Sequence, residues 1–244
     1  MAQAVAIWLD IVPDPLLPKL VSKLARDVVE NGLTVGFVGV RYMFEALAKS
    51  NRTQAALECI ARPGYPGYHY ELYNEYEPAT SLWESWNVPF QTCIVCETSR
   101  DHHYQASINT FLRRFVTGLD MADGSAGWAA LRVRPEAALV PKTMLSFASV
   151  TVLSHRGVIH FAWEHAARGE MTMHLTVPSG SVAEVHVPKN QAIQSVTESN
   201  ELIWTKHGAL TNKLKSIRFV NDDGRFLIFS TGSGTYFFET RIMH

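Results

Sequence analysis

The sequence has few cysteines, no long apolar run and no excess of one charge. Three cysteines among 244 residues cannot form a disulfide framework, so a reducing, cytoplasmic compartment is the default expectation. No apolar run approaches the roughly 20 residues that span a bilayer. The 22 Lys and Arg residues nearly balance the 23 Asp and Glu residues, which gives a net charge of −1. These absences leave no electrostatic basis for binding nucleic acid or an anionic membrane.

The N-terminal ten residues are apolar but contain no basic residue, and Asp10 and Pro13 follow before any cleavage site. We therefore expect a buried helix that is truncated where the sequence begins, and no signal peptide. With 47% hydrophobic and 18% charged residues, the whole sequence is typical of a globular protein with a substantial core.

Residues 1 to about 120 show helical periodicity. The clearest helix is predicted over 15–31, where apolar residues recur at helical spacing: Leu17, Leu20, Val21, Leu24 and Val28. Asp14 is placed to cap its start and Gly32 to cap its end. Further helices are predicted around 37–47, after Asn51 as far as Pro63, and over 103–117. In the last of these we expect Leu112 and Phe115 to point inward.

From about Trp128 the apolar period changes to two, as in Ile159, Phe161 and Trp163. Similar strands are predicted at 131–134, 145–153, 171–177, 185–187, 216–220, 225–230 and 235–241. Turn residues such as Asp222-Asp223-Gly224 separate them, so an antiparallel β-sandwich is expected. The boundary between the helical region and the strand-forming region is expected near 121–126.

The segment 65–86 is rich in aromatic and acidic residues, among them Trp83, Glu84 and Trp86. Sugar rings stack their C–H faces on flat aromatic rings, and carboxylates bind their hydroxyl groups. The same composition is also typical of aromatic residues that seal helix ends beside solvated carboxylates. Composition alone leaves both interpretations open.

Six motifs in register resemble glycoside hydrolase family 78, the α-L-rhamnosidases. They are GFVGVRYMFEAL at 36–47, YPGYHY at 65–70, TSLWESW at 80–86, SRDH at 99–102, LRVRP at 131–135 and GSGTYFF at 232–238. The resemblance covers nearly the whole chain. It implies a partial α/α toroid over 1–122, with about five helices of an incomplete six-hairpin barrel. An antiparallel β-sandwich over 123–244 follows it.

The resemblance also implies site residues and a substrate. Glu84 matches the family's general base, which activates water in an inverting hydrolysis of terminal α-L-rhamnose. His102 matches a residue that lines the rhamnose subsite, and we expect Trp83 and Trp86 to line the same concave patch. No metal or cofactor is implied. An inverting site needs a second carboxyl group as acid, about 6.5–9.5 Å from the base.

Departures from the family's pattern bear on activity. The stretch that carries the family's general acid is absent, Ser85 replaces the Arg after the base, and Asp101 replaces the Asn before the histidine. We therefore expect residues 1–244 alone to be inactive, as a C-terminal fragment of a rhamnosidase. The alternatives are a catalytically inactive carbohydrate-binding remnant and an interaction protein. The broken toroid edge would then make a homo-oligomer or bind a complementary chain.

Cys93 and Cys96, followed by His102 and His103, offer the residue types of a tetrahedral zinc site. Adjacent histidines on one helix point in different directions, however, and no second CxxC pair is present. An unpaired and partly buried cysteine pair is therefore the favoured interpretation.

Overall fold

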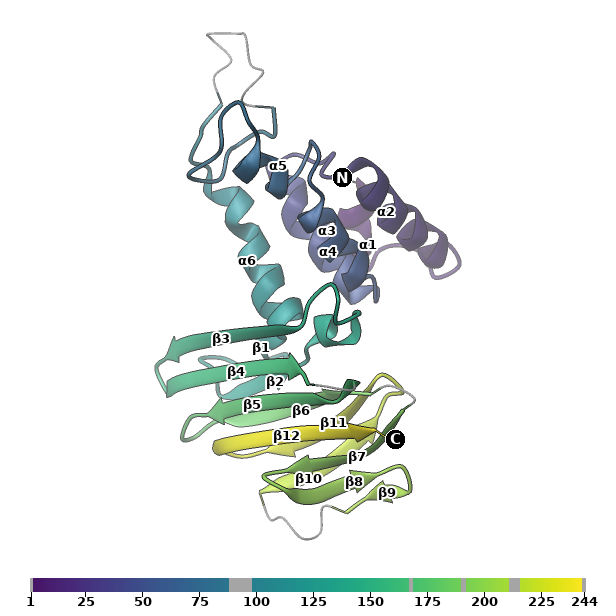
Figure 1. Cartoon of the computed structure of the whole chain (residues 1–244), viewed down its shortest axis with the longest axis vertical. Coiled ribbons are helices and arrows are strands. Elements are labelled where there is room, and N and C mark those ends of the chain that lie inside the picture. The colour runs from purple at the N-terminus through teal and green to yellow at the C-terminus, as the bar shows by residue number, and fades with distance from the viewer. Residues whose placement is uncertain (1, 88–97, 167–168, 190–191, 211–215, 243–244) are drawn as a thin grey trace. The chain divides into compact units, whose positions relative to one another are not determined.

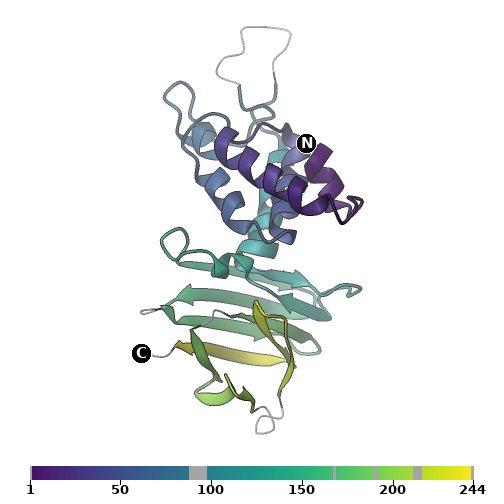
Figure 2. The same cartoon turned by 90° about the vertical axis from the view of Figure 1, so that its right-hand side faces the viewer.

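The structure is a computed structural model that describes residues 2–87, 98–166, 169–189, 192–210 and 216–242. It contains two compact units, Met1–Phe111 and Leu112–His244, coloured purple to teal and teal to yellow in Figures 1 and 2. The division lies before the expected boundary at 122/123, because residues 112–117 and β1 (Leu119–Met121) both contact strands of the second unit.

The first unit is helical. Its elements are α1 (Ala2–Trp8), α2 (Leu17–Asn31), α3 (Phe37–Lys49), α4 (Thr53–Ala61), α5 (Tyr68–Tyr73), a 3-10 segment (His103–Ser107) and α6 (Ile108–Phe111). The centre of the unit is α3, which α1, α2, α4 and α6 all contact. Val40, Met43, Phe44 and Leu47 are buried there, at the helical spacing that the sequence shows.

Only one end of α2 forms as expected. Gly32 has a φ of 72°, and its N–H donates to the Val28 carbonyl at 3.0 Å, which confirms the predicted C-cap. A Cβ at Gly32 would come within 2.4 Å of the Pro66 carbonyl oxygen, so the position requires glycine. The predicted N-cap is wrong: the helix starts at Leu17, Leu16 takes the N-cap position without a side-chain cap, and the Leu17 N–H donates to the backbone carbonyls of Pro13 and Asp14.

The helix predicted over 103–117 is not uniform. The 3-10 segment and α6 are followed by a π-helical segment, Leu112–Thr117, in the second unit. A wider turn changes the direction of each side chain from that of an α-helix. The prediction that Leu112 points inward is wrong, because its side chain is 36% exposed.

The second unit is a β-sandwich. Its strands are β1, β2 (Ala130–Val133), β3 (Phe147–Ser154), β4 (Gly157–His165), β5 (Met171–Val177), β6 (Val182–Pro188), β7 (Ile193–Glu198), β8 (Glu201–Thr205), β9 (Gly208–Ala209), β10 (Ile217–Asp222), β11 (Phe226–Thr231) and β12 (Gly234–Ile242). They form two sheets, β1-β2-β6-β11-β10 and β3-β4-β5-β12-β7-β8-β9. Inward residues such as Phe161, Trp163, Phe229 and Phe238 make the core.

One strand pair departs from the expected antiparallel pattern. β2 and β6 pair in parallel, with Leu131 opposite Ala183. Parallel neighbours need a crossover connection. Here the crossover is β3, β4 and β5, which belong to the other sheet.

A charged network joins three parts of the five-stranded sheet. Arg134 donates to Glu136 at 2.8 Å and to Asp223 at 3.0 Å, and it lies 3.2 Å from Nδ1 of His186. Burial lowers the pKa of His186, although its hydrogen bond to Glu184 opposes the change. A neutral ring fits this geometry, since Nδ1 can accept from Arg134 while Nε2 donates to Glu184 at 2.6 Å. Arg134 therefore links β2, β6 and the turn before β11.

No helix in the described ranges has both the length and the apolar character needed to cross a bilayer.

Candidate functional site

A short turn and α5 bring the aromatic segment into the helical unit. The Arg62 guanidinium donates to the carbonyls of Gly64 and Tyr65, at 3.1 and 2.9 Å, and so braces the turn before α5. At the other end of α5, the Asn74 side chain donates to the carbonyls of Tyr70 and Glu77. Its oxygen accepts the Glu77 N–H at 2.8 Å. Asn74 thus ends the helix and fixes the direction of the chain toward Glu84.

Glu71 on α5 is fully buried, with 0% of its surface exposed. Its Oε1 accepts the Trp83 N–H at 2.5 Å, and its backbone carbonyl accepts the Ala79 N–H at 2.9 Å. Oε2 is buried without a hydrogen-bond partner among the described residues. Burial raises the pKa of Glu71 to about 7, although the hydrogen bond from Trp83 lowers it. The Glu71 carboxyl group therefore fixes the position of Trp83, which is the residue next to Glu84.

Glu84 and His102 lie on two segments that pair like neighbouring strands. The Glu84 N–H donates to the Ser99 carbonyl at 2.8 Å, and the His102 N–H donates to the Leu82 carbonyl at 2.8 Å. Oε2 of Glu84 also accepts the Ser99 N–H at 2.9 Å. The Ser81 hydroxyl adds a further bond, to the Arg100 carbonyl at 2.5 Å. We call this pairing of 81–84 with 99–102 the ladder; it sets Glu84 and His102 on facing segments, with Glu84 beside Ser99 and His102 beside Leu82.

An ion pair closes the ladder on one side. Arg100 donates through Nε and Nη2 to the two carboxylate oxygens of Glu77, at 2.5 and 3.2 Å. The hydrogen bond from Arg100 lowers the pKa of Glu77, so this carboxyl group remains ionised and paired. Glu77 is thus unsuited to act as a general acid, because a general acid must be protonated.

His102 lies among aromatic rings at the start of the 3-10 segment. Its ring is 4.6 Å from that of Phe37 and is stacked 5.5 Å from those of His103 and Tyr104, measured between centroids. Its Nδ1 is buried and has no hydrogen-bond partner among the described residues. Because Nδ1 is buried, only the exposed part of this half-buried ring can meet a ligand hydroxyl group.

The two tryptophans next to Glu84 point into the unit. Trp83 is 2% exposed and Trp86 is 6% exposed, and the Trp86 indole N–H donates to the Val35 carbonyl at 2.8 Å. The Trp86 ring packs edge-on against Tyr68 at 5.2 Å. Both rings are therefore enclosed in the helical unit, and little of either is exposed to solvent. The exposed aromatic rings of the segment are instead Tyr65, Tyr73 and Tyr76.

Sequence reasoning flagged Glu84 and His102 but not the residues that hold them. Glu71, Asn74 and Gln105 are buried polar residues that no motif marked. The Tyr68 hydroxyl donates to the Gln105 carbonyl at 2.8 Å and so joins α5 to the 3-10 segment. Of these three residues, only Asn74 carries a local signal that could have identified it. It is an asparagine that follows a helical stretch and precedes further polar residues, as turn residues do.

The zinc alternative falls partly outside the structure, because Cys93 and Cys96 lie outside the described residues. Within the described ranges, no three His, Cys, Asp or Glu side chains gather as a metal site would require. The remaining cysteine, Cys59, is buried, and burial raises the pKa of its thiol to about 12.

Comparisons with known proteins agree with this architecture. Residues 1–116 match the family model for the bacterial alpha-L-rhamnosidase 6 hairpin glycosidase domain, and residues 118–201 match the model for the bacterial alpha-L-rhamnosidase C-terminal domain. A search of curated proteins finds no match.

Solved structures share the fold at low sequence identity. An alpha-L-rhamnosidase from Dictyoglumus thermophilum superposes with a TM-score of 0.82 at 24% identity, over 98% of this chain and 25% of that one. One from Streptomyces avermitilis, complexed with L-rhamnose, gives 0.78 at 20% identity, over 98% and 21%. One from Aspergillus terreus gives 0.71 at 17% identity, over 99% and 24%.

The chain spans no more than a quarter of the length of these structures, which contain much more than the two units described above. Their likeness establishes the fold, and the two adjacent family models establish the kinship. The chain, with its rhamnosidase-type helical and sandwich domains in tandem, belongs to the α-L-rhamnosidases of glycoside hydrolase family 78.

Proposed function

We propose that the ladder is part of the active site of an inverting α-L-rhamnosidase, with Glu84 as general base and His102 as a rhamnose-binding residue. The observation that carries the proposal is the pair of backbone hydrogen bonds that set Glu84 and His102 on facing segments. The family's motif pattern assigns the two roles. The ladder makes them compatible, because a base and a sugar-binding group must face the same substrate.

The Glu84 carboxylate is oriented for this work. Oε2 is held by the Ser99 N–H, which, among the described residues, leaves Oε1 to bind the attacking water. Trp83 and Trp86 on either side of it are buried, which anchors this segment in the helical unit. Hydrolysis with inversion then proceeds as water attacks the anomeric carbon, loses a proton to Glu84, and the leaving oxygen takes a proton from an acid.

The resemblance assigns a base in residues 1–244 but no acid, because the stretch that carries the family's general acid is absent from the sequence. Glu77 is paired with Arg100, and Glu71 is enclosed in the core of the helical unit. A positioned acid typically contributes 10²–10⁴-fold to the rate, and loss of substrate positioning costs more. We therefore propose that this chain alone binds rhamnose weakly and does not turn over rhamnosides at an enzyme-like rate.

The test measures L-rhamnose binding by NMR titration and hydrolysis of 4-nitrophenyl α-L-rhamnoside. We expect weak binding that His102→Ala abolishes, while His103→Ala, at the exposed neighbouring position, retains it. Glu84→Gln should bind as wild type does. Turnover that is lost in Glu84→Gln would show a second catalytic carboxyl group and overturn the claim of inactivity. Binding that His102→Ala leaves unchanged would overturn the proposed subsite.

The helical unit also exposes apolar side chains that a complete barrel would cover, including Leu9, Ile11, Leu16, Val29 and Val38. We propose that such side chains pack against further six-hairpin helices, whether in a longer chain or in a complementary one. Residues 1–244 on their own would then cover them by self-association.

A further inference from the structure

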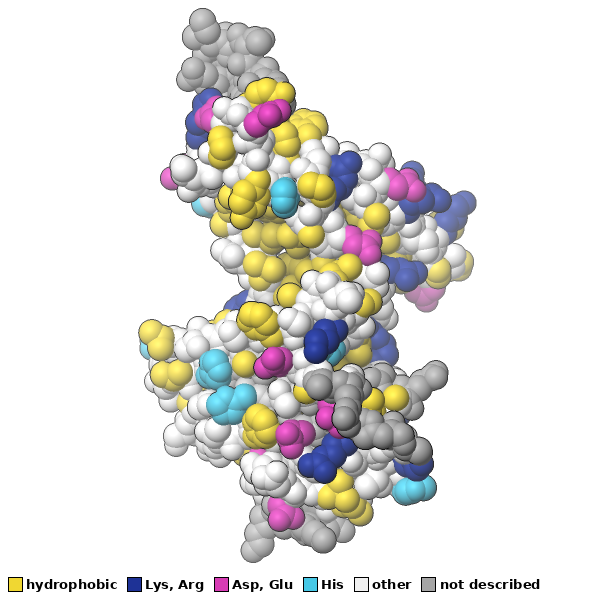
Figure 3. Space-filling view, in the orientation of Figure 1, with side chains coloured by type: hydrophobic (Ala, Val, Ile, Leu, Met, Phe, Trp, Pro, Cys, Tyr) yellow, Lys and Arg dark blue, Asp and Glu magenta, His cyan; other side chains and the backbone are white. Residues whose placement is uncertain are grey.

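The outer face of the seven-stranded sheet is open to solvent in the second unit. Because side chains alternate along β3, β4, β5 and β12, Phe161, Trp163 and Phe238 enter the core while their neighbours point outward. Among these outward residues, Phe147 is 62% exposed and Phe237 is 40% exposed. Figure 3 looks onto this face and shows hydrophobic and histidine side chains close together over the front sheet.

The strand register produces a hollow on this face. Ser149 on β3 lies opposite Ala162 on β4, and Ala162 lies opposite His174 on β5. These two small side chains are flanked by much larger ones, since Phe147 pairs with Glu164 and His174 pairs with Phe237. The result is a hollow of about 360 Å³ with Phe147 and Phe237 among its walls. Its volume falls within the range of small-ligand sites, which starts at roughly 300 Å³.

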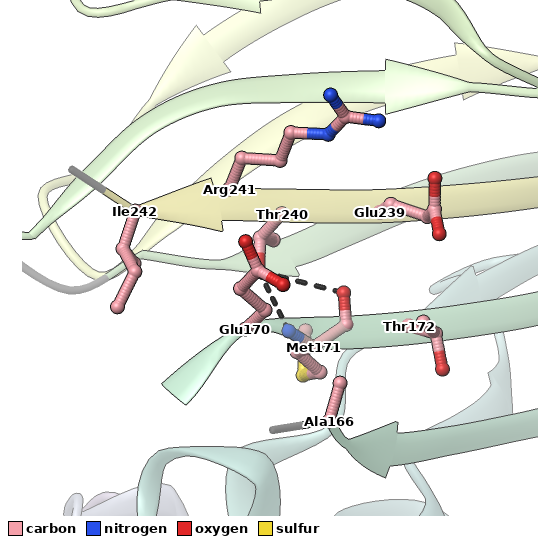
Figure 4. Close-up of a pocket in the computed structure, with 8 residues that line it drawn as sticks. All are labelled: Ala166, Glu170, Met171, Thr172, Glu239, Thr240, Arg241 and Ile242. Carbon is pink, nitrogen blue, oxygen red and sulfur yellow. Dashed lines mark hydrogen bonds between the residues drawn. The ribbon is translucent and has the colours of Figure 1, made fainter. Parts of the chain in front are cut away.

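A second hollow, of similar volume, continues the first across the sheet. Thr172 lines both hollows and pairs with Glu239 on β12. Figure 4 shows the carboxylate of Glu170 between β5 and β12, with Glu239 and Thr172 side by side and the Arg241 side chain extending away from β5. The two hollows, which share Thr172, therefore place an aromatic lining next to one of carboxylate and hydroxyl groups, and we call the two together the groove.

Two aromatic rings beside hydroxyl, imidazole and carboxylate groups match the two-sided chemistry of a sugar ring. The C–H face of a sugar can stack on Phe147 or Phe237, while His174, Thr172 and Glu164 bind its hydroxyl groups. Three carboxylates against one guanidinium make the groove unfavourable for uronic acids. We propose that this groove is a second, non-catalytic binding site for a neutral saccharide.

The proposal is independent of the ladder, because the groove belongs wholly to the sandwich unit. Such a site would retain a glycan near the enzyme and raise its local concentration, as linked binding sites do. Its failure would leave the proposed role of Glu84 and His102 untouched.

The test titrates residues 1–244 with neutral oligosaccharides of glucose and mannose, and with a galacturonic acid oligosaccharide, by NMR and affinity electrophoresis. At least one neutral probe should bind, and the acidic one should not. Phe237→Ala and Phe147→Ala should each weaken this binding about tenfold, a change of about 1.4 kcal/mol.

Three controls make the outcome decisive. Leu153→Ala alters an 83% exposed residue elsewhere on β3 and should bind as wild type does. His102→Ala should also retain binding, which separates this site from the ladder. Thermal unfolding checks that each variant folds. Failure of every neutral probe, or wild-type affinity in both phenylalanine variants, would overturn the proposal. So would self-association through this face, seen as dissociation of dimers in the phenylalanine variants without any saccharide binding.

Discussion

Glu71 shows how a single buried side chain can govern the segment beside the candidate base. Its carboxyl group joins α5 to the Trp83 N–H, and its second oxygen has no described partner. Burial raises its pKa to about 7, so the folded protein binds a proton that the unfolded chain releases near its ordinary value. The stabilising effect of that proton is complete below about pH 4.5.

We predict that the helical unit loses about 2–3 kcal/mol of stability as the pH rises from about 4.5 to 7, and little beyond. Glu71→Gln keeps an oxygen for Trp83 and stays neutral, so it should remove this dependence and be the more stable protein at pH 8. Urea unfolding at pH 5.5 and pH 8, followed by tryptophan fluorescence, measures both effects. Glu75→Gln, at an exposed position nearby, is the matched control. An unchanged pH dependence in Glu71→Gln would contradict the prediction.

The sequence identified Glu84 and His102 through motif and residue type, but it did not identify Glu71. A glutamate in a short helix between tyrosines is ordinarily solvated, and no apolar period surrounds it to indicate burial. Its environment depends on the return of the chain at Trp83, which is a tertiary contact. The roles of Glu84 and His102 themselves stay predictions.

At the scale of the elements, the Gly32 cap and the strand alternation were reliable local signals, whereas the Asp14 cap and the strand pairing were not. Gly32 ends α2 as its sequence context predicts, and the alternation of Ile159, Phe161 and Trp163 predicts which side of β4 faces the core. The parallel pairing of β2 with β6 and the π-helical segment have no local signature. Both depend on contacts between distant parts of the chain, which periodicity does not encode.

The network around Arg134 makes a testable contribution to the sandwich. Removing the guanidinium leaves Glu136, which is largely buried, and Asp223 without one of their cations. Loss of one partner of a buried pair costs roughly 3–5 kcal/mol, and partial exposure reduces this. We predict that Arg134→Ala destabilises the sandwich unit by about 2–3 kcal/mol, measured by thermal unfolding. Arg218→Ala, on the exposed side of β10, should cost less than about 0.5 kcal/mol. Equal losses in the two variants would refute the role of the network.

At the scale of the whole chain, each unit has its own core, but the helical unit leaves apolar side chains uncovered. Figure 3 shows hydrophobic side chains gathered on the face of this unit that it displays. Monomeric proteins rarely expose more than a few hundred Å² of contiguous apolar surface.

We predict that purified residues 1–244 self-associate and bind an apolar dye. Combined replacement of Leu9, Ile11 and Leu16 by Ser should shift the mass measured by light scattering toward the monomer. Leu153→Ser, in the sandwich unit, should not. A wild-type chain that stays monomeric at high concentration without dye binding would count against a broken barrel edge.

The ladder also has an evolutionary consequence. Its hydrogen bonds tie residues 81–84 directly to 99–102, so the relation between Glu84 and His102 does not depend on the length of chain that connects them. The entropy needed to close a loop rises only slowly with its length. Insertions and deletions between the two segments are therefore inexpensive, and natural variation can remodel the connecting chain while the ladder keeps its pairing.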